Sequence, residues 1–245
     1  MKAEGVTPTP TAVGGEVFDY CIVGGGAAGC VLASRLTEDP SCRVLLLEAG
    51  PPDRHPFIHI PAAFIFVYRD QRHNWHYQTE PDPSLDGRTT SITQGKVLGG
   101  SSSINGMLHV RAHKEELDAW VRSGCTGWSH EDLLPYYCKA ETYLGPSGDR
   151  VAGRGYEGPL GVTYPSTFHP LTQSFVQAAQ QAGLPFLADM NGPSREGVAY
   201  HQQNRRGRLR SQPAQSHLRP ARGRSNLTVR TGALVTRVHM AGRRA

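Results

Sequence analysis

The sequence predicts an α/β fold with a Rossmann-like domain that opens with a β-α-β unit. Three observations support this prediction: a short apolar segment at 20–23, a glycine-rich turn leading into a helical pattern, and a second apolar run, VLLLE, that ends at Glu48. Short apolar runs on either side of a helix are typical of parallel strands buried on both faces. With 245 residues and 38% hydrophobic residues, the chain can bury a core as one large domain or two small ones.

The glycine-rich turn has the spacing G-x-G-x-x-G and precedes a helix predicted over 28–36. Gly24 permits the tight turn from strand to helix, and Gly26 lets the backbone approach a pyrophosphate. Gly29 and Ala33 let the helix lie close to the sheet. The start of the helix offers free N–H groups and a partial positive charge to phosphates. The turn therefore predicts a dinucleotide site.

An acidic residue closes the second predicted strand. Glu48 lies nineteen positions after Gly29, where a carboxylate can bind ribose hydroxyls. A carboxylate there argues against NADP, because it would repel the additional phosphate. The motif does not by itself distinguish FAD from NAD, and a glycine-rich turn that binds nothing is the alternative.

A second glycine cluster, GKVLGGSSSINGML, runs from Gly95 to Leu108. It could be a flexible hinge or a backbone cradle for a charged ligand. Main-chain N–H groups at paired glycines can approach an anion closely. The hydroxyls of Ser101 and Ser102 can bind phosphate oxygens or cap a following helix.

This cluster resembles the first signature of the glucose–methanol–choline (GMC) oxidoreductases, FAD enzymes that oxidise alcohols. The order is Gly, a basic residue, two apolar residues, two Gly, small hydroxyl residues, an apolar residue and Asn, matched here from Gly95 to Asn105. The chain is most similar to the choline-dehydrogenase-like branch. The resemblance implies a Rossmann-like FAD-binding domain with the beginning of an α+β substrate domain, truncated before the C-terminal segment of the family.

The resemblance also implies which residues bind FAD. Some members attach FAD through a His at the position of Ile104, so FAD is expected to bind non-covalently here. No catalytic residue and no metal ligand are assigned, and His109 is interpreted as a packing residue. For Val235, a core valine without a cofactor contact is the alternative. The implied cofactor-binding residues are Gly24, Gly26, Ala27, Ala28, Gly29, Glu48, Ala49, Val97, Gly99, Gly100, Ser101, Asn105, Gly106, Met107, Leu108 and Val235.

The domain organisation is predicted from the same resemblance. We expect a disordered leader at 1–16, the first part of the FAD-binding domain at 17–157, the start of the substrate domain at 158–222, and strands that return to the FAD domain at 223–245. A helix after Ser129 should carry a capping box with Asp132. Two alternating strands are predicted around Thr231–Gly232.

Charge and cysteine content limit other classes of function. The net charge is +5, and eight arginines lie between Arg205 and Arg230. A nucleic-acid surface is one interpretation, but no zinc spacing or aromatic RNA-binding motif accompanies it, and a solvated loop region is the other. Five cysteines without a C-x-x-C pair indicate reduced thiols, so we expect a cytoplasmic location. No apolar run is long enough for a membrane helix, and the N-terminus does not resemble a secretory signal.

Three hypotheses follow. The leading one is the FAD-binding portion of a flavoprotein that oxidises choline or another primary alcohol to an aldehyde. The family accepts the alcohol proton on a C-terminal His–His or His–Asn pair, which this sequence lacks. The chain alone is therefore expected to be inactive. Pairing with a C-terminal half is one way to complete the enzyme. The second is a catalytically silent flavin-binding or assembly module. The third is an arginine-rich nucleic-acid binder.

Overall fold

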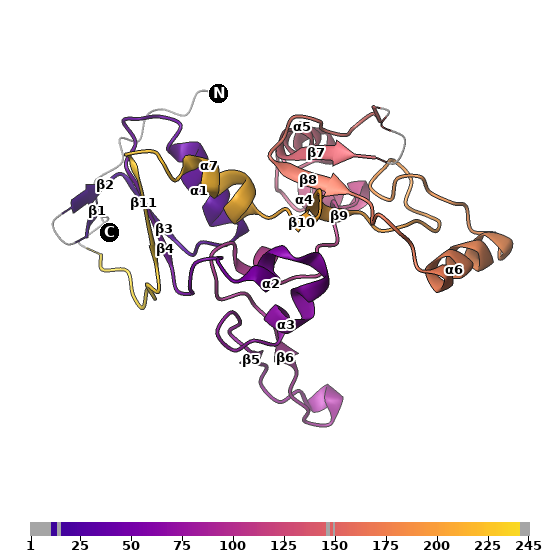
Figure 1. Cartoon of the computed structure of the whole chain (residues 1–245), viewed down its shortest axis with the longest axis horizontal. Helices are drawn as coiled ribbons and strands as arrows, with labels where there is room; N and C mark the ends of the chain where they lie inside the picture. The colour runs from indigo at the N-terminus through magenta and orange to yellow at the C-terminus, as the bar shows by residue number, and fades with distance from the viewer. Residues whose placement is uncertain (1–10, 14–15, 146–147, 149, 241–245) are drawn as a thin grey trace. The chain divides into compact units, whose positions relative to one another are not determined.

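A computed structural model describes residues 11–13, 16–145, 148 and 150–240, and its contacts divide the chain into two compact units (Figure 1). The first unit comprises Met1–Gly106 and Gln212–Ala245, and the second comprises Met107–Ser211. These bounds differ from the domain bounds predicted at 157/158 and 222/223. Part of the predicted leader is a strand, because β1 (Thr11–Val13) pairs antiparallel with β2 (Glu16–Phe18). The rest of the leader, 1–10 and 14–15, lies outside the described residues.

The first unit is built on a parallel sheet in the order β11-β4-β3. The predicted β-α-β start is confirmed: β3 spans Tyr20–Val23, α1 spans Ala27–Leu36 and β4 spans Val44–Glu48. The expected burial holds for β4 but is wrong for β3, which lies at the edge of this sheet with Tyr20 and Val23 40% and 57% exposed. The strand β11 (Leu227–Thr231) joins from far along the sequence and lies beside β4, as the yellow and indigo strands in Figure 1 show. The chain thus returns to its own N-terminal sheet after forming the second unit.

The helix α1 covers this sheet through small side chains. Cys30 and Ala33 are fully buried and pack against Val44 and Leu46 of β4. A helical turn, η4 (Ala214–Leu218), packs against α1 with Ala214 and Leu218 in the same core, and Pro213 precedes it with helical backbone angles. This is the first-turn position in which proline is tolerated.

Short elements complete the first unit. A second small core holds Ile58, Val67, Val97 and Ile104. The elements are α2 (Pro56–His59), η1 (Pro61–Ala63), α3 (Phe64–Tyr68), β5 (Tyr77–Gln78), η2 (Pro83–Leu85), β6 (Ser91–Ile92), η3 (Gly100–Ser103) and α7 (Arg219–Ala221).

The second unit has a four-stranded mixed sheet in the order β10-β9-β8-β7. Its elements are α4 (Lys114–Arg122), α5 (His130–Ala140), β7 (Glu141–Leu144), β8 (Leu160–Thr163), α6 (Pro170–Gln181), β9 (Gln203–Arg206) and β10 (Leu209–Arg210). The capping box predicted at α5 is confirmed, because the Ser129 and Asp132 side chains bond each other's backbone N–H groups. Parallel and antiparallel pairs with helices alongside give this unit an α+β architecture.

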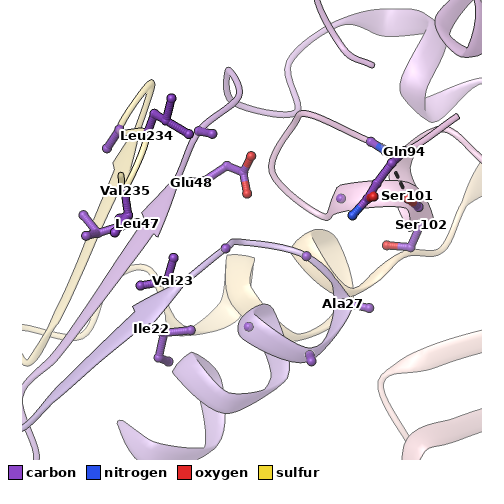
Figure 2. A pocket seen from close by; sticks show the side chains of 18 of the residues that line it. Ile22, Val23, Ala27, Leu47, Glu48, Gln94, Ser101, Ser102, Leu234 and Val235 are labelled. Carbon is purple, nitrogen blue, oxygen red and sulfur yellow. Dashed lines mark hydrogen bonds between the residues drawn. The ribbon is translucent and has the colours of Figure 1, made fainter. Parts of the chain in front are cut away.

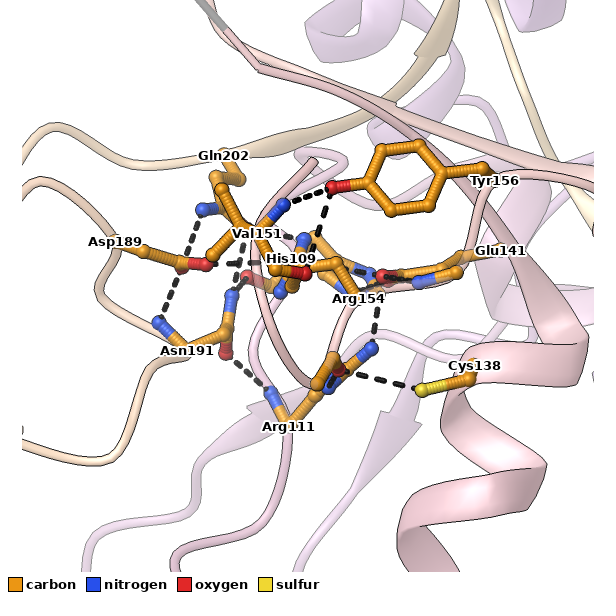
Figure 3. Close-up of polar contacts among 12 residues, drawn as sticks. His109, Arg111, Cys138, Glu141, Val151, Arg154, Tyr156, Asp189, Asn191 and Gln202 are labelled. Atoms are coloured by element: carbon orange, nitrogen blue, oxygen red, sulfur yellow. Dashed lines mark hydrogen bonds and ion pairs between the residues drawn. The ribbon is translucent and has the colours of Figure 1, made fainter. Parts of the chain in front are cut away.

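A buried carboxylate organises the interior of the second unit (Figure 3). Glu141 is 1% exposed, and its Oε1 lies 2.8 Å from Nη2 of Arg111 and 3.1 Å from Nε of Arg154. Nε2 of His109 lies 3.3 Å from its other oxygen. Burial raises the pKa of Glu141, but His109 and the two guanidinium groups outweigh that effect and hold the pKa below its usual value. The carboxylate is therefore a charged structural centre.

The second of the two strands predicted around Thr231–Gly232 does not form, so that prediction is wrong. Gly232 has φ of +68°, which turns the chain after β11. Its N–H donates to the carbonyl of Gly50, and the N–H of Ala233 donates to the carbonyl of Glu48, both at 2.9 Å. The chain is thereby held at the carboxyl end of β4 without a ladder of its own.

Several arginines of the basic stretch serve the fold. In the first unit, Nη1 of Arg224 donates to the carbonyl of Ser34 and to Oγ1 of Thr37 at the end of α1. In the second unit, Arg210 is 1% exposed, and Nη2 of Arg205 donates to the carbonyl of Tyr164. Arginines used in this way are not available as a continuous basic stripe, which weakens the nucleic-acid hypothesis.

Candidate functional site: a nucleotide cleft

A cleft of about 590 Å³ opens in the first unit at the carboxyl ends of β3 and β4 (Figure 2). Ligands of open α/β sheets bind at this edge. Figure 2 shows Leu234 and Val235 at one end, Ser101 and Ser102 at the other, and Glu48 between them. The residues predicted from the sequence that line this cleft are Gly24, Gly26, Ala27, Ala28, Gly29, Glu48, Ala49, Gly100, Ser101 and Val235.

The first glycine cluster requires its glycines for different reasons. Gly24 has φ of +94°, so the turn from β3 to α1 uses the left-handed region. A Cβ on Gly29 would lie 2.1 Å from the carbonyl oxygen of Gly24, so this residue fixes how closely the helix approaches the strand. A Cβ on Gly26 would meet nothing within 4 Å, because it would point into open space. Gly26 therefore leaves room for a ligand.

The start of α1 offers backbone donors to the cleft. The first bond of the helical ladder is from the N–H of Cys30 to the carbonyl of Gly26, at 3.0 Å, so the N–H groups of Ala27, Ala28 and Gly29 have no partner in the helix. Within the described chain, no side chain caps this helix and its first turn holds no acid. These N–H groups and the helix dipole favour an anion such as a pyrophosphate.

Glu48 is fixed from both sides by backbone. One carboxylate oxygen accepts the N–H of Gly25 at 2.7 Å, and the other accepts the N–H of Gly50 at 2.8 Å. The side chain is 5% exposed and lines the cleft. Each oxygen keeps a further lone pair, so the carboxylate can still accept hydroxyl groups of a ribose.

The second glycine cluster packs directly against the first. The N–H of Gly99 donates to the carbonyl of Gly25 at 2.6 Å. Gly100 has φ of +56°, and a Cβ there would lie 2.9 Å from Cα of Gly26. A Cβ on Gly95 would lie 2.3 Å from the carbonyl carbon of Gly100. The segment is therefore a close-packed wall of the cleft, and the alternative of a free hinge does not hold.

The serines of this wall bond mainly to their own backbone. Oγ of Ser101 accepts the N–H of Gly95 at 3.0 Å, and Oγ of Ser102 donates to the carbonyl of Gly99 at 2.5 Å. The capping alternative does not hold, because both serines lie within η3, whose cap is Gly99, and His113 caps the next helix, α4. Ser101 lines the cleft and retains its hydroxyl proton for a ligand oxygen, so its phosphate contact stays a prediction.

The remaining predicted residues do not line the cleft. Val97 is fully buried in the core with Ile104, and Gly99 contributes its N–H to the packing of the wall. Asn105 and Gly106 follow η3 at the end of the first unit, outside the cleft lining. Met107 and Leu108 belong to the second unit, where Asn204 N–H donates to the Met107 carbonyl. Their contacts with flavin remain predictions.

Other lining residues did not stand out in the sequence. Val23 and Leu47 occupy the ends of their strands, so the rule for α/β sheets could have located them. Trp75 and Gln94 also line the cleft, and Nζ of Lys96 lies 4.6 Å from the centre of the Trp75 ring. The one signal at Trp75 is its alternation with Tyr77, which is typical of a strand and does not indicate a ligand.

Histidine chemistry is not evident at this cleft, since none of its lining residues is a histidine. His109 lies in the second unit, where Nδ1 is 2.8 Å from Oδ1 of Asn204 and Nε2 faces Glu141. This agrees with its interpretation as a packing residue.

Among the described residues, no cluster of three or more His, Cys, Asp or Glu is arranged to hold a metal ion, and no helix has the length and apolarity to span a membrane.

The comparison with known proteins identifies the family. The family model for GMC oxidoreductase matches residues 18–245. The chain is 45% identical over 242 residues to the mitochondrial choline dehydrogenase of Mus musculus, covering 96% of this chain and 40% of that protein. It is 46% identical to the oxygen-dependent choline dehydrogenase of Klebsiella pneumoniae, covering 93% of this chain and 42% of that protein. The chain thus spans about two fifths of these relatives.

Solved structures agree with the sequence relatives. Pyridoxine 4-oxidase from Mesorbium loti superposes with a TM-score of 0.84 at 37% identity, over 91% of this chain and 44% of that one. An FAD-dependent oxidoreductase from Chaetomium thermophilum gives a TM-score of 0.80 at 33% identity, over 86% of this chain and 38% of that one. Together with the two packed glycine clusters, these matches show that the chain belongs to the GMC oxidoreductase family of flavoproteins and corresponds to its N-terminal FAD-binding region.

Proposed function

We propose that this chain binds FAD non-covalently in the nucleotide cleft and serves as the FAD-binding part of a flavoprotein that oxidises an alcohol. The observation that carries the proposal is the placement of unpaired N–H groups at Ala27, Ala28 and Gly29 opposite the wall at Gly100 and Ser101. Such a concave backbone surface suits a pyrophosphate, which both halves of FAD share.

The other parts of the cleft fit the remaining groups of the adenosine half. Glu48 presents a fixed carboxylate to ribose hydroxyls. Ala233, Leu234 and Val235 form an apolar edge held in place by the bonds from Gly232 and Ala233 to β4. A flat adenine ring is suited to such an edge. The structure supports binding of the adenosine half more directly than binding of the flavin ring. The predicted partners of the flavin ring, Met107 and Leu108, lie in the second unit.

Two features support non-covalent attachment. Ile104 has no nucleophilic atom, so it cannot form the bond that a histidine would form. Its side chain is 1% exposed and packs with Ile58, Val67 and Val97 instead of lining the cleft. We therefore propose that FAD is held by non-covalent contacts with the backbone donors, Glu48 and the apolar edge at Ala233, Leu234 and Val235.

Bound FAD supplies a hydride acceptor for alcohol oxidation. The residues of this chain hold and orient it, and we assign no proton acceptor among them. The relatives named choline dehydrogenases favour choline or a similar primary alcohol as substrate of the complete protein. A catalytically silent flavin-binding or assembly module is the alternative.

Anaerobic flavin reduction tests the proposal. The chain would be saturated with FAD and mixed with choline or pyridoxine, alone and with the C-terminal portion of a choline dehydrogenase relative. We expect no reduction by the chain alone, and loss of the flavin absorption with a primary alcohol once the second portion is added. A stable complex of the two portions that holds flavin, but whose flavin is not reduced by any of the alcohols, would favour the silent module.

A further inference from the structure

A second cleft of about 380 Å³ lies in the first unit. It is lined by Pro51, Pro52, Arg54, His55, Arg72 and His73, none of which lines the nucleotide cleft. We call it the basic cleft, because its lining holds two arginines and two histidines and no acid.

The arginines of the basic cleft lack partners. Arg54 and Arg72 are both exposed, and among the described residues neither guanidinium group has a hydrogen bond or an ion pair. The nearest acids along the sequence are engaged elsewhere. Asp53 accepts Nε2 of Gln212 at 3.1 Å, and Asp70 accepts the backbone N–H of Arg72 at 2.9 Å and contacts Nδ1 of His73. The positive charge of the guanidinium pair is therefore not neutralised by an ion pair.

One of the two histidines provides a further donor. His73 is 3% exposed, and its Nδ1–H donates to the Asp70 carboxylate, so the neutral ring has no second N–H to offer. The N–H of Arg72, with the His73 ring, holds the pKa of Asp70 below its usual range, so this carboxylate stays charged. Nδ1 of His55 accepts the N–H of Phe57 at 3.3 Å, so the neutral ring carries its proton on Nε2. The two rings meet edge to face with centres 5.4 Å apart.

Both walls of the basic cleft are tied to one backbone segment. The carbonyl of Pro51 accepts the N–H of Leu98 at 3.0 Å, and the carbonyl of His73 accepts the N–H of Lys96 at 2.8 Å. These donors flank Val97, which is fully buried. Residues distant in the sequence are thus held together by the packed core, and the cleft is a built feature of the fold.

We propose that the basic cleft binds a phosphate group, either as inorganic phosphate or as a small phosphate monoester. Guanidinium groups bind phosphate through paired N–H donors, and a dianion matches two positive charges better than a carboxylate does. The histidine N–H adds a donor at the same cleft. This assignment does not depend on FAD binding, because the two clefts share no lining residue.

Calorimetric titration of the full 245-residue chain at constant ionic strength tests the proposal, with inorganic phosphate, glycerol 3-phosphate and acetate as separate titrants. The test variant carries both Arg54→Gln and Arg72→Gln, and the control variant is Arg69→Gln. Arg69 is also exposed, belongs to the same unit and does not line the cleft, so Arg69→Gln controls for the loss of one positive charge, half the change in the double variant. Circular dichroism would confirm that each variant is folded.

We expect saturable binding of phosphate and weaker binding of acetate. The double variant should bind phosphate at least about tenfold more weakly, because two charge-assisted contacts are lost, while Arg69→Gln should bind as the parent does. Tighter binding of glycerol 3-phosphate would identify a monoester as the ligand, and tighter binding of inorganic phosphate would identify the free anion. The assignment would be overturned if phosphate showed no saturable binding, or if Arg69→Gln lost as much affinity as the double variant. It would also be overturned if the double variant bound phosphate as tightly as the parent, as expected if phosphate binds at α1.

Discussion

The N–H of Gly99 donates a hydrogen bond to the carbonyl of Gly25, with 2.6 Å between nitrogen and oxygen. This bond joins two glycine clusters that are far apart in the sequence. Gly100 lies so close to Gly26 that a Cβ on Gly100 would be 2.9 Å from the Cα of Gly26. The nucleotide cleft is consequently bounded by backbone on both sides, and side-chain substitutions at these glycines should separate effects on folding from effects on binding.

Alanine substitutions at Gly29 and Gly26 should have different consequences. At Gly29 the new methyl group would lie 2.1 Å from the carbonyl oxygen of Gly24 and force α1 away from the sheet. We expect Gly29→Ala to lower the free energy of unfolding by about 2 kcal/mol or more. At Gly26 the methyl group meets nothing within 4 Å, so Gly26→Ala should cost about 1 kcal/mol or less.

FAD titration separates the two variants. The Gly26→Ala methyl group would occupy space required by a pyrophosphate, so this folded variant should bind FAD about tenfold or more weakly. Urea unfolding and flavin fluorescence measure the two effects independently. If Gly26→Ala bound FAD as the parent does, the pyrophosphate would not lie at this turn.

Replacing Glu48 with glutamine should weaken both the fold and the site. The carboxylate accepts two backbone N–H groups, from Gly25 and Gly50, whereas an amide has one acceptor oxygen and would present an NH₂ to the other N–H. We expect a loss of about 1–3 kcal/mol in the free energy of unfolding and weaker FAD binding. Glu38→Gln is the control, since its ion pair with Arg35 is exposed and should change stability by less than about 1 kcal/mol. Equal effects in the two variants would contradict the structural role of Glu48.

The second unit should depend on the charge of Glu141. Removing this charge by Glu141→Gln leaves the buried guanidinium group of Arg111 without its carboxylate, and leaves Arg154 with the more distant carboxylate of Asp189, 3.7 Å from its Nε. The expected loss is about 3–5 kcal/mol in the free energy of unfolding. Glu157→Gln provides the control, because Glu157 is exposed in the same unit. A loss below about 1 kcal/mol in urea unfolding of Glu141→Gln would contradict the account.

The same carboxylate predicts a direction of pH dependence. The pKa of Glu141 is lower in the folded protein than in the unfolded chain, so its charged form is favoured by folding. Its contribution to stability is complete above the unfolded pKa, about 4.3, and is lost as the pH falls through the folded pKa. Urea unfolding at a series of acidic pH values should therefore show a smaller pH dependence for Glu141→Gln than for the parent.

Cysteine alkylation tests the packing of α1. Burial raises the pKa of Cys30 to about 12, and its Sγ donates to the carbonyl of Gly25. Cys30 should therefore resist iodoacetamide in the native chain and react after denaturation. Cys125 is exposed and serves as the positive control. Mass spectrometry of peptides reports both sites, and rapid native labelling of Cys30 would show that α1 does not remain packed on the sheet.

The sequence is sufficient for the β-α-β start because strong local signals coincide there. Apolar runs mark β3 and β4, and the glycine spacing marks the turn between them. Ser129 and Asp132 likewise specify the start of α5 by a local bond pattern. Features of this kind depend on residues close together in the chain, and the structure confirms them.

Features that depend on distant residues were not predictable in the same way. The segment after Gly232 has an alternating pattern but forms no strand, and the N–H groups of Gly232 and Ala233 donate to the carbonyls of Gly50 and Glu48 near the cleft. Met107 lies within the second glycine cluster but belongs to the second unit. Trp75 reaches the cleft through the fold of a loop, which no local pattern encodes. Tertiary contacts decide such positions.

Non-covalent FAD binding by this chain can be decided from the visible absorption spectrum of the purified chain, taken after incubation with FAD and desalting and again after denaturation. We expect a flavin spectrum that co-elutes with the folded chain and is released on denaturation, because the proposed site offers backbone donors and Glu48 to FAD and no nucleophile at Ile104. A folded chain that elutes without flavin would contradict binding by this chain, and flavin that remains attached after denaturation would contradict the non-covalent site.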